Sequence, residues 1–266
     1  MKIHWRAAAV VICVVLVGLA RIASAQSPAP TPTTQATGSV SPPAQGGIAG
    51  PRMAYVPPPR GAPSARVNGG SRGSGVSLIS LMVLAPDHTG LTVREQPTLY
   101  WYQSEPADVP FELTVIEDNV ATPILQVRRP DAMKSGIHKL RLADYGVKLA
   151  RGIEYEWVIA LVVDDESRSK DVVASGLIQR VEPAASLSRR LTHASKQEIP
   201  FIYAEEGIWY DALQALSDLI EAHPADGSLL VERAALLNQV GLAKPAALTE
   251  TSIVADGGFR MRPGSP

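Results

Sequence analysis

Cysteine is almost absent from this sequence of 266 residues. The single one, Cys13, lies in an apolar run near the N-terminus. The rest of the chain therefore forms no disulfide framework in an oxidising compartment. It also offers no thiol nucleophile and no cysteine-based zinc site.

An excess of either charge is also missing. The chain holds 25 lysines and arginines against 26 aspartates and glutamates, for a formal net charge of −1. Lys2, Arg6 and Arg21 are the charged residues among the first 25, so 22 basic and 26 acidic residues remain beyond them, a net charge of −4. Nothing in this weakly acidic balance favours a nucleic-acid partner, and none is expected.

The patterns that bind nucleotides and metals are missing as well. No Walker loop and no dinucleotide-binding glycine motif occurs in the sequence. The histidines beyond the first 25 residues are His88, His138, His193 and His223, and no two of them are three or four positions apart. We therefore predict no catalytic residue, no metal site and no cofactor.

One short segment, Gly69–Gly73, does fit the G-x-S-x-G pattern of a serine nucleophile. That chemistry needs a strand before the serine and a helix after it, because their junction forces a strained turn. Here a Gly-, Ser- and Arg-rich stretch lies on both sides. We interpret this stretch as an ordered lead-in that lies along the edge of the β-sandwich expected after it. Anion binding through Arg66, Arg72 and backbone N–H groups is the alternative.

The apolar run belongs to an N-terminal segment typical of secretory signals. Basic residues precede Ala7–Ala20, and Ala23–Ala25 supplies the small residues that a signal peptidase reads. A membrane-spanning helix needs about 20 apolar residues, and this run is shorter and is followed by Arg21. We expect a signal peptide at residues 1–25 and a periplasmic or secreted protein. An uncleaved membrane anchor is the alternative, and it is the only membrane contact expected.

Residues 26–60 hold nine prolines among Ser, Thr, Ala, Gly and Gln. Such a segment has too little apolar side chain to offset the entropy of ordering it. We predict a disordered, Pro-rich tether over residues 26–60. A ligand for a peptide-binding module is the alternative.

Residues 61–181 have the pattern of a β-sandwich behind a Gly/Arg-rich lead-in. Short segments rich in β-branched and aromatic residues are separated by Pro, Gly, Asp and Asn. About seven such strands over roughly 100 residues predict an antiparallel sandwich of the immunoglobulin or fibronectin type III kind. The expected strands cover residues 77–86, 96–103, 111–117, 121–129, 137–143, 154–163 and 171–181, with a turn at 87–90.

The clearest alternation lies in the strand expected at 154–163. Its odd-numbered residues from Tyr155 to Val163 are apolar or aromatic and share one face, while Glu154 and Glu156 begin the other. Tyr155 matches the tyrosine that bonds back to the preceding turn in such sandwiches. Trp101 is expected to be an inward-facing aromatic residue of an earlier strand.

From Pro183 the apolar period becomes helical. We predict a first helix at 184–195 and further helices broken at Gly207, at Pro224–Gly227 and at Gly241. Large, small and turn-breaking residues then fall where a tetratricopeptide repeat places them, namely Tyr203, Gly207, Trp209, Ala212, Leu216, Leu219 and Pro224. We therefore predict an α-helical hairpin unit at 184–243 and a flexible tail at 244–266. Because one and a half repeats cannot bury their own apolar face, the unit should dock on the sandwich or on a partner.

Acidic residues cluster at the expected hairpin tip, where Asp164–Glu166 lies near Asp171. Calcium prefers such oxygen ligands, but the spacing of an EF-hand and its glycine are missing. Arg168 and Lys170 lie among the acids. We interpret the cluster as a solvated turn with local ion pairs.

Four blocks of the chain, in order, carry a family resemblance. They are RGAPSARVNGGSRG, GLTVREQPTLYWYQ, EYEWVIALVVDDESRSKDVVASGLIQRVEP and YAEEGIWYDAL, within residues 60–243. Together they resemble the exported bacterial family described as domain of unknown function 928. The resemblance implies no catalytic residue, because the family's biochemical role is unassigned.

The chain departs from that family at two positions. Many members have one cysteine just after the Gly-rich block and another at the end of the EWVIALVV strand. Gly75-Val76 and Val163 stand in these places here. The resemblance therefore implies that a disulfide between these two places is absent from this chain.

These observations together predict an α+β protein, with an immunoglobulin- or fibronectin-like sandwich followed by a tetratricopeptide-like hairpin. The leading hypothesis is an exported, non-enzymatic interaction or scaffolding protein whose partner is another envelope protein. The alternatives are a hydrolase or transferase with a site between sandwich and helices, and a structural protein attached to the cell envelope. The candidate binding residues are Arg66, Arg72, Tyr100, Tyr102 and Trp209, the aromatic ones on condition that they are exposed. The ligand and the oligomeric state stay open.

Overall fold

The computed structural model describes residues 53–58, 66, 79–118, 120–130 and 132–247. The chain divides into two units, Met1–Ile48 and Ala49–Pro266, and every described residue lies in the second. The expected signal peptide lies outside the described residues, as do most of the expected tether and of the tail. Among the described residues, no helix has both the length and the apolar character needed to cross a membrane.

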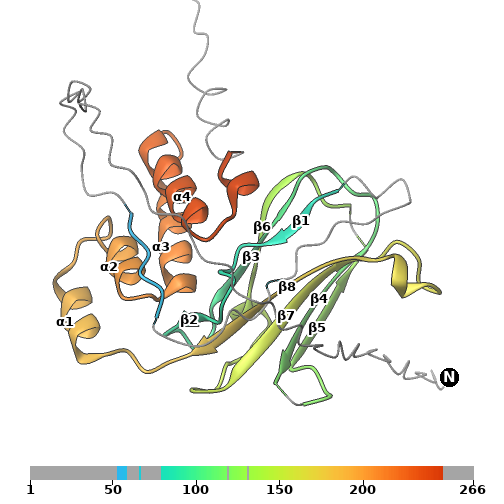
Figure 1. Ribbon diagram of the computed structural model, residues 1–266, viewed down its shortest axis with the longest axis horizontal. Coiled ribbons are helices and arrows are strands. Elements are labelled where there is room, and N and C mark those ends of the chain that lie inside the picture. Colours follow the sequence, from blue (N-terminus) through green and yellow to red (C-terminus); the bar gives the residue numbers. More distant parts are fainter. Residues whose placement is uncertain (1–52, 59–65, 67–78, 119, 131, 248–266) are drawn as a thin grey trace, which may run out of the picture. The chain divides into compact units, whose positions relative to one another are not determined.

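The strands of the described residues form two sheets (Figure 1). One sheet has five strands in the order β2-β8-β7-β4-β5, and the other has three in the order β1-β3-β6. Neighbouring strands are antiparallel except for β2 and β8, which are parallel. The strands are β1 (Leu81–Val83), β2 (Gly90–Thr92), β3 (Thr98–Gln103), β4 (Phe111–Glu117), β5 (Leu125–Arg129), β6 (Gly136–Arg141), β7 (Glu154–Leu161) and β8 (Val172–Arg180).

The α-helices follow the last strand, so strand-rich and helical parts are separate along the chain. They are α1 (Ala185–His193), α2 (Ile199–Glu205), α3 (Trp209–Ala222) and α4 (Gly227–Gln239), while two short 3-10 turns, Leu142–Tyr145 and Arg168–Lys170, lie among the strands. This mixture confirms the predicted α+β class.

The predicted helix breaks are confirmed. Gly207 and Gly241 follow the ends of α2 and α4 with φ of 73° and 74°, a left-handed conformation that a residue with a Cβ adopts only at a cost.

The alternation predicted for the strand at 154–163 is present in β7. Tyr155, Trp157 and Ile159 are each at most 2% exposed, while Glu156 is exposed. The Tyr155 hydroxyl also accepts a hydrogen bond from the backbone N–H of Ala150, with an N···O distance of 3.2 Å. This is the bond to the preceding turn that the sequence led us to expect.

Strand β2 was missed, because its first residue, Gly90, belongs to the expected turn at 87–90 and only two strand residues follow it. The strand is three residues long and pairs with β8, which lies more than 80 positions away in the sequence. At Gly90, an added Cβ would lie 2.6 Å from Cε2 of Tyr210, so α3 approaches this strand too closely for a side chain. Such contacts between distant segments leave no periodic pattern in the local sequence.

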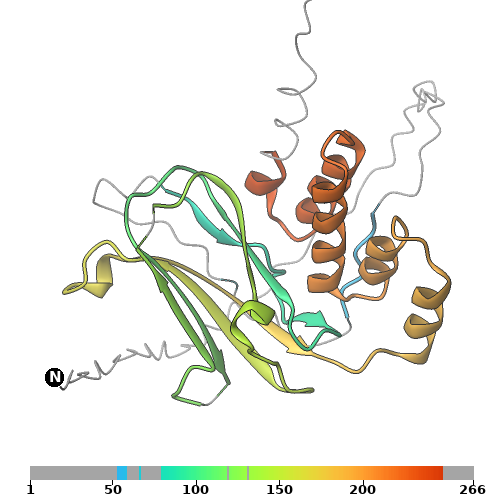
Figure 2. The same ribbon diagram turned by 180° about the vertical axis from the view of Figure 1, so that it is seen from behind.

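Strand β3 is buried on both of its faces. On one face, the ring of Trp101 lies 5.9 Å from that of Phe111 in the five-stranded sheet. At the start of the strand, the N–H of Thr98 donates to the side chain of Gln214 on α3, over 3.2 Å. Helix α3 therefore lies against the three-stranded sheet, and Figures 1 and 2 both show α3 beside β2 and β3. The helical unit docks on the sheets, which is one of the two expected outcomes.

Two aromatic residues at the start of α3 fix this docking. The indole N–H of Trp209 donates to the carbonyl of Leu84 over 2.9 Å. The hydroxyl of Tyr210 accepts from the indole N–H of Trp157 over 2.8 Å and donates to the carbonyl of Leu177 over 2.9 Å. Both α3 side chains are at most 1% exposed, so these bonds satisfy polar groups that water does not reach.

Tyr210→Phe tests this link between helix and sheets. The variant leaves the Trp157 N–H and the Leu177 carbonyl without their buried partner, which should lower the free energy of unfolding by about 1–3 kcal/mol. Equilibrium unfolding in urea measures the loss. Tyr145→Phe is the matched control, because the Tyr145 hydroxyl bonds Arg129 at the surface, and we expect a change within about 0.5 kcal/mol. Equal losses in the two variants would contradict the assignment.

Candidate functional site

The three aromatic candidates lie in the core. Tyr100, Tyr102 and Trp209 are 3%, 6% and 0% exposed. Burial raises the pKa of Tyr100 to about 12, so its hydroxyl is neutral at physiological pH. These three residues were expected to anchor a partner only if their side chains were exposed. All three are buried.

Arg66 links two parts of the fold. One of its terminal nitrogens donates to the carbonyls of Ala85 and Val240, over 2.8 and 3.0 Å. Burial lowers the pKa of this half-buried guanidinium. Arg66 thus holds the chain against the end of α4 and the loop after β1. Its expected partners for anion binding, Arg72 and the glycine-rich segment 69–73, lie outside the described residues.

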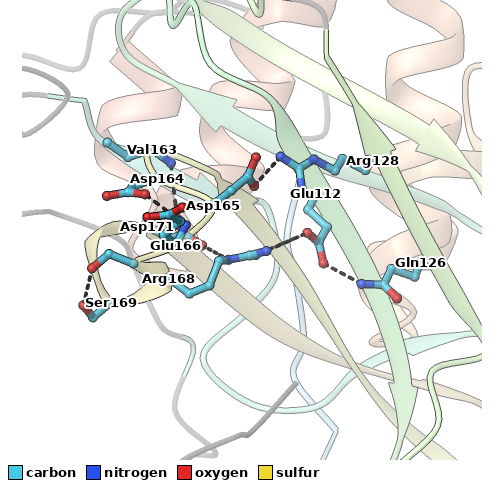
Figure 3. Close-up of polar contacts among 11 residues, drawn as sticks. Glu112, Gln126, Arg128, Val163, Asp164, Asp165, Glu166, Arg168, Ser169 and Asp171 are labelled. Atoms are coloured by element: carbon cyan, nitrogen blue, oxygen red, sulfur yellow. Dashed lines mark hydrogen bonds and ion pairs between the residues drawn. The ribbon is translucent and has the colours of Figure 1, made fainter. Parts of the chain in front are cut away.

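Three of the four acids at the hairpin tip are paired with cations, and Arg168 also pairs with Glu112 of β4 (Figure 3). The pairs are Lys170–Asp164, Arg128–Asp165, Arg168–Asp171 and Arg168–Glu112, with N···O distances of 2.7, 2.6, 2.6 and 3.2 Å. These contacts confirm the interpretation as a turn with local ion pairs. Most of the partners are exposed, so each such pair contributes only about 0.2–1 kcal/mol. Within the described ranges, no group of three or more His, Cys, Asp or Glu residues could hold a metal ion.

His88 lies between an acid and a phenol. Its Nδ1 is 3.2 Å from a carboxylate oxygen of Asp87, and its Nε2 is 2.9 Å from the hydroxyl of Tyr55. A proton on Nδ1 facing the carboxylate leaves Nε2 to accept from the phenol. Burial raises the pKa of Tyr55, so the phenol keeps its proton and is no nucleophile. The geometry fixes Tyr55 in place rather than activating it.

Asp211, at the start of α3, is a fully buried carboxylate. It accepts a hydrogen bond from the N–H of Val93 over 3.2 Å, and it forms an ion pair of 3.2 Å with Arg94. Burial raises the pKa of Asp211 to about 6, although Thr92, Arg94 and the Val93 N–H all lower it. Its neighbours are the backbone and side chains next to β2, so the carboxylate ties that strand to α3.

A segment of the expected tether is ordered and forms the most informative contact of the described chain. We call residues Met53–Pro58 the strap. The N–H groups of Met53 and Tyr55 donate to the side chains of Glu232 and Gln239, each over 2.8 Å. The Gln239 amide donates back to the carbonyl of Met53 over 2.9 Å. The expectation of disorder over 26–60 is therefore corrected for residues 53–58.

The strap also contacts α2 through its backbone. The N–H of Val56 donates to the carbonyl of Ala204 over 3.1 Å. A Cβ added at Gly207 would lie 2.7 Å from the Val56 carbonyl oxygen, so the glycine permits this close approach. The strap, blue in Figure 1, thus lies against α2 and α4.

Alternate side chains of the strap point into the protein. Met53 and Tyr55 are 3% and 8% exposed, whereas Val56 is 54% exposed. The Tyr55 ring packs edge-on against Trp209, with 5.0 Å between ring centroids, and stacks near His88 at 6.0 Å. We call Ala204, Gly207, Trp209, Glu232 and Gln239, together with His88, the strap-binding surface.

The free energy that holds the strap is small. Ordering six residues costs about 6–12 kcal/mol at about 1–2 kcal/mol each. Burying two side chains returns about 3–6 kcal/mol. Four backbone hydrogen bonds return about 2–6 kcal/mol, and the aromatic contact about 1 kcal/mol. The free-energy cost of ordering the strap and the gain from its contacts therefore agree within a few kcal/mol.

Residues 26–60 were expected to be a tether or, alternatively, a ligand for a peptide-binding module, and Trp209 was a candidate binding residue. The contact between the strap and this residue was not predicted. The apolar run Met53–Val56 within the Pro-rich stretch was the available signal. Glu232 and Gln239 gave none, because a polar residue on an exposed helix face is ordinary.

Comparison with known proteins adds one match. The family model described as Domain of Unknown Function (DUF928) matches residues 67–250, which is more than two thirds of the chain. The strap-binding surface lies within these residues, and the strap lies before them. No curated protein matches the chain.

Asp211→Asn gives a prediction about pH. Because the pKa of Asp211 is raised to about 6 in the folded state, the folded chain binds this proton more tightly than the unfolded chain does. The contribution of Asp211 to stability should therefore fall as the pH rises from about 4 to about 6, by a total of about 3 kcal/mol. In Asp211→Asn this fall is absent, so the variant gains stability relative to the parent across that range.

Urea unfolding at a series of pH values from 4 to 7.5 measures the difference. Asp218→Asn, at an exposed position of the same helix, is the control and should show a much smaller change. A difference between parent and Asp211→Asn that stays constant with pH would show that this carboxylate does not titrate as described.

Proposed function

The chain belongs to the DUF928 family, and we propose that it is an exported, non-enzymatic interaction protein whose helices hold an extended peptide chain. The observation that carries this proposal is the strap. An extended segment lies on α2 and α4, held by four hydrogen bonds to its own backbone.

The mode of contact supports peptide binding. In recognition of extended peptides, main-chain hydrogen bonds supply affinity and alternate side chains supply specificity. The side-chain amide of Gln239 accepts a hydrogen bond from one N–H group of the strap and donates one to a carbonyl of the strap. Met53 and Tyr55 are the alternate side chains that are buried.

The state of the reactive groups supports a non-enzymatic role. Three of the four acids at the hairpin tip are paired with cations, and His88 is engaged with Asp87 and Tyr55. Asp211 faces backbone and Arg94 next to β2. In each case the neighbours are groups that position the side chain, and they leave no pair of acid and base aimed at a shared point.

We also propose that the two sheets form an immunoglobulin- or fibronectin-like sandwich. Support comes from the orders β1-β3-β6 and β2-β8-β7-β4-β5, in which β1 and β2, at the start of the chain's strands, contribute to opposite sheets. The bond from Tyr155 to the preceding turn is a further feature of such sandwiches.

Likewise, we propose that the helices are a tetratricopeptide-like unit. The residues that suggested the repeat support this. Trp209, Ala212 and Leu216 are buried at the contacts of α3, and Gly207 separates α2 from α3.

Cross-linking from α4 tests the proposed function. Val231, next to Glu232, and Val120, between β4 and β5, are 51% and 41% exposed. A photoreactive amino acid at position 231 of the full chain, produced in its own cells, should form a defined adduct with one envelope protein. The same group at position 120 is the control and should not form that adduct. Identical adducts from both positions, or none from position 231 in a folded protein, would count against the proposal.

Export is tested in the same cells. A C-terminal tag should be recovered with the periplasmic or secreted fraction. Its recovery with the cytoplasm would overturn the exported location.

A further inference from the structure

We propose that the strap-binding surface is a site for an extended segment of a partner protein with the pattern large apolar residue–any residue–tyrosine, and that the strap is its resident, displaceable occupant. This inference rests on the proposed function and adds the chemistry of the ligand and a means of regulation.

The backbone contacts set no requirement for a particular sequence. Glu232, Gln239 and the carbonyl of Ala204 all bond to N–H or carbonyl groups of the strap. Any extended chain presents these groups at the same spacing, so another chain can form the same four bonds.

Two positions of the strap select the sequence. Met53 is buried, and Tyr55 both packs on Trp209 and places its hydroxyl 2.9 Å from Nε2 of His88. The residues at positions 54 and 56 are exposed and therefore free to vary. The pattern that fits is accordingly a large apolar side chain followed two positions later by tyrosine.

The residues after Val56 limit the length of the bonded segment. Pro57 and Pro58 have no N–H groups, so backbone donation ends at Val56. Pro58 lies against Gly207, where an added Cβ would be 3.3 Å from its ring. A partner segment that continues in proline or in another extended conformation fits this end.

The boundary of the family match separates the surface from its occupant. Residues 67–250 include the strap-binding surface but not the strap. The surface therefore belongs to the shared domain, and the strap is supplied by the segment before it. The free-energy cost of ordering the strap is close to the free energy gained from its contacts. A partner segment with the same apolar residue and tyrosine can therefore displace it.

The experiment uses the full chain and a labelled synthetic peptide with the sequence of residues 50–60, GPRMAYVPPPR. In Tyr55→Ala the resident strap is weakened while the surface is unchanged. We expect this variant to bind the peptide at least about tenfold more tightly than the parent does, because a tethered competitor acts at a high effective concentration. Val56→Ala is the matched control, since this side chain is exposed, and it should behave as the parent.

Two further measurements identify the site. Adding Gln239→Ala to Tyr55→Ala should abolish the gain in affinity, and a peptide with alanine in place of tyrosine should not bind Tyr55→Ala. Circular dichroism and thermal unfolding verify that each variant is folded. No binding to folded Tyr55→Ala, or equal binding of the alanine peptide, would overturn the inference.

Competition separates this inference from the proposed function. Excess unlabelled peptide should remove the adduct formed from position 231. An adduct that persists at saturating peptide would overturn the inference and leave the interaction function standing. Peptide binding with no adduct in cells would instead count against the interaction function. The parent chain could instead prove to be a dimer that dissociates when the peptide is added. The occupant would then be the strap of a second copy, and the assignment to a partner protein would be overturned.

Discussion

The first three residues of α3 hold the helices and the sheets together. Trp209, Tyr210 and Asp211 are consecutive, and each bonds to a different part of the strand-rich region, at Leu84, at β7 and β8, and next to β2. Consecutive helical residues point about 100° apart. The three side chains can form these bonds together only if the end of the helix is inserted among several strands. The orientation of α3 is therefore fixed, and α2 and α4 are positioned with it.

That orientation also creates the strap-binding surface. One side chain serves both purposes, because Trp209 bonds the sheet through its indole nitrogen and contacts Tyr55 with its ring. The contact with the strap and the docking of the helices on the sheets are therefore physically coupled at this residue. A change that loosens α3 should weaken the strap even when no residue touching the strap is altered.

The sequence predicted the separation into strands and helices, the helix ends at Gly207 and Gly241, and the alternation of β7. Each of these follows from neighbours along the chain. It did not predict β2, the burial of Tyr100, or the order of the strap, because each depends on a surface from a distant segment. Composition suggested disorder for residues 26–60. The stretch has few apolar side chains, but those of Met53 and Tyr55 are buried against helices as far as 184 positions later in the sequence.

The run of prolines that follows Val56 has a consequence for self-association. An extended segment with open donors and acceptors is a template on which other chains can add as strands, and such growth leads to fibrils. In the strap, the donors of Met53, Tyr55 and Val56 are taken by the protein, and the next two residues have none to offer. These contacts reduce the number of open donors along the strap to which a further chain could add as a strand.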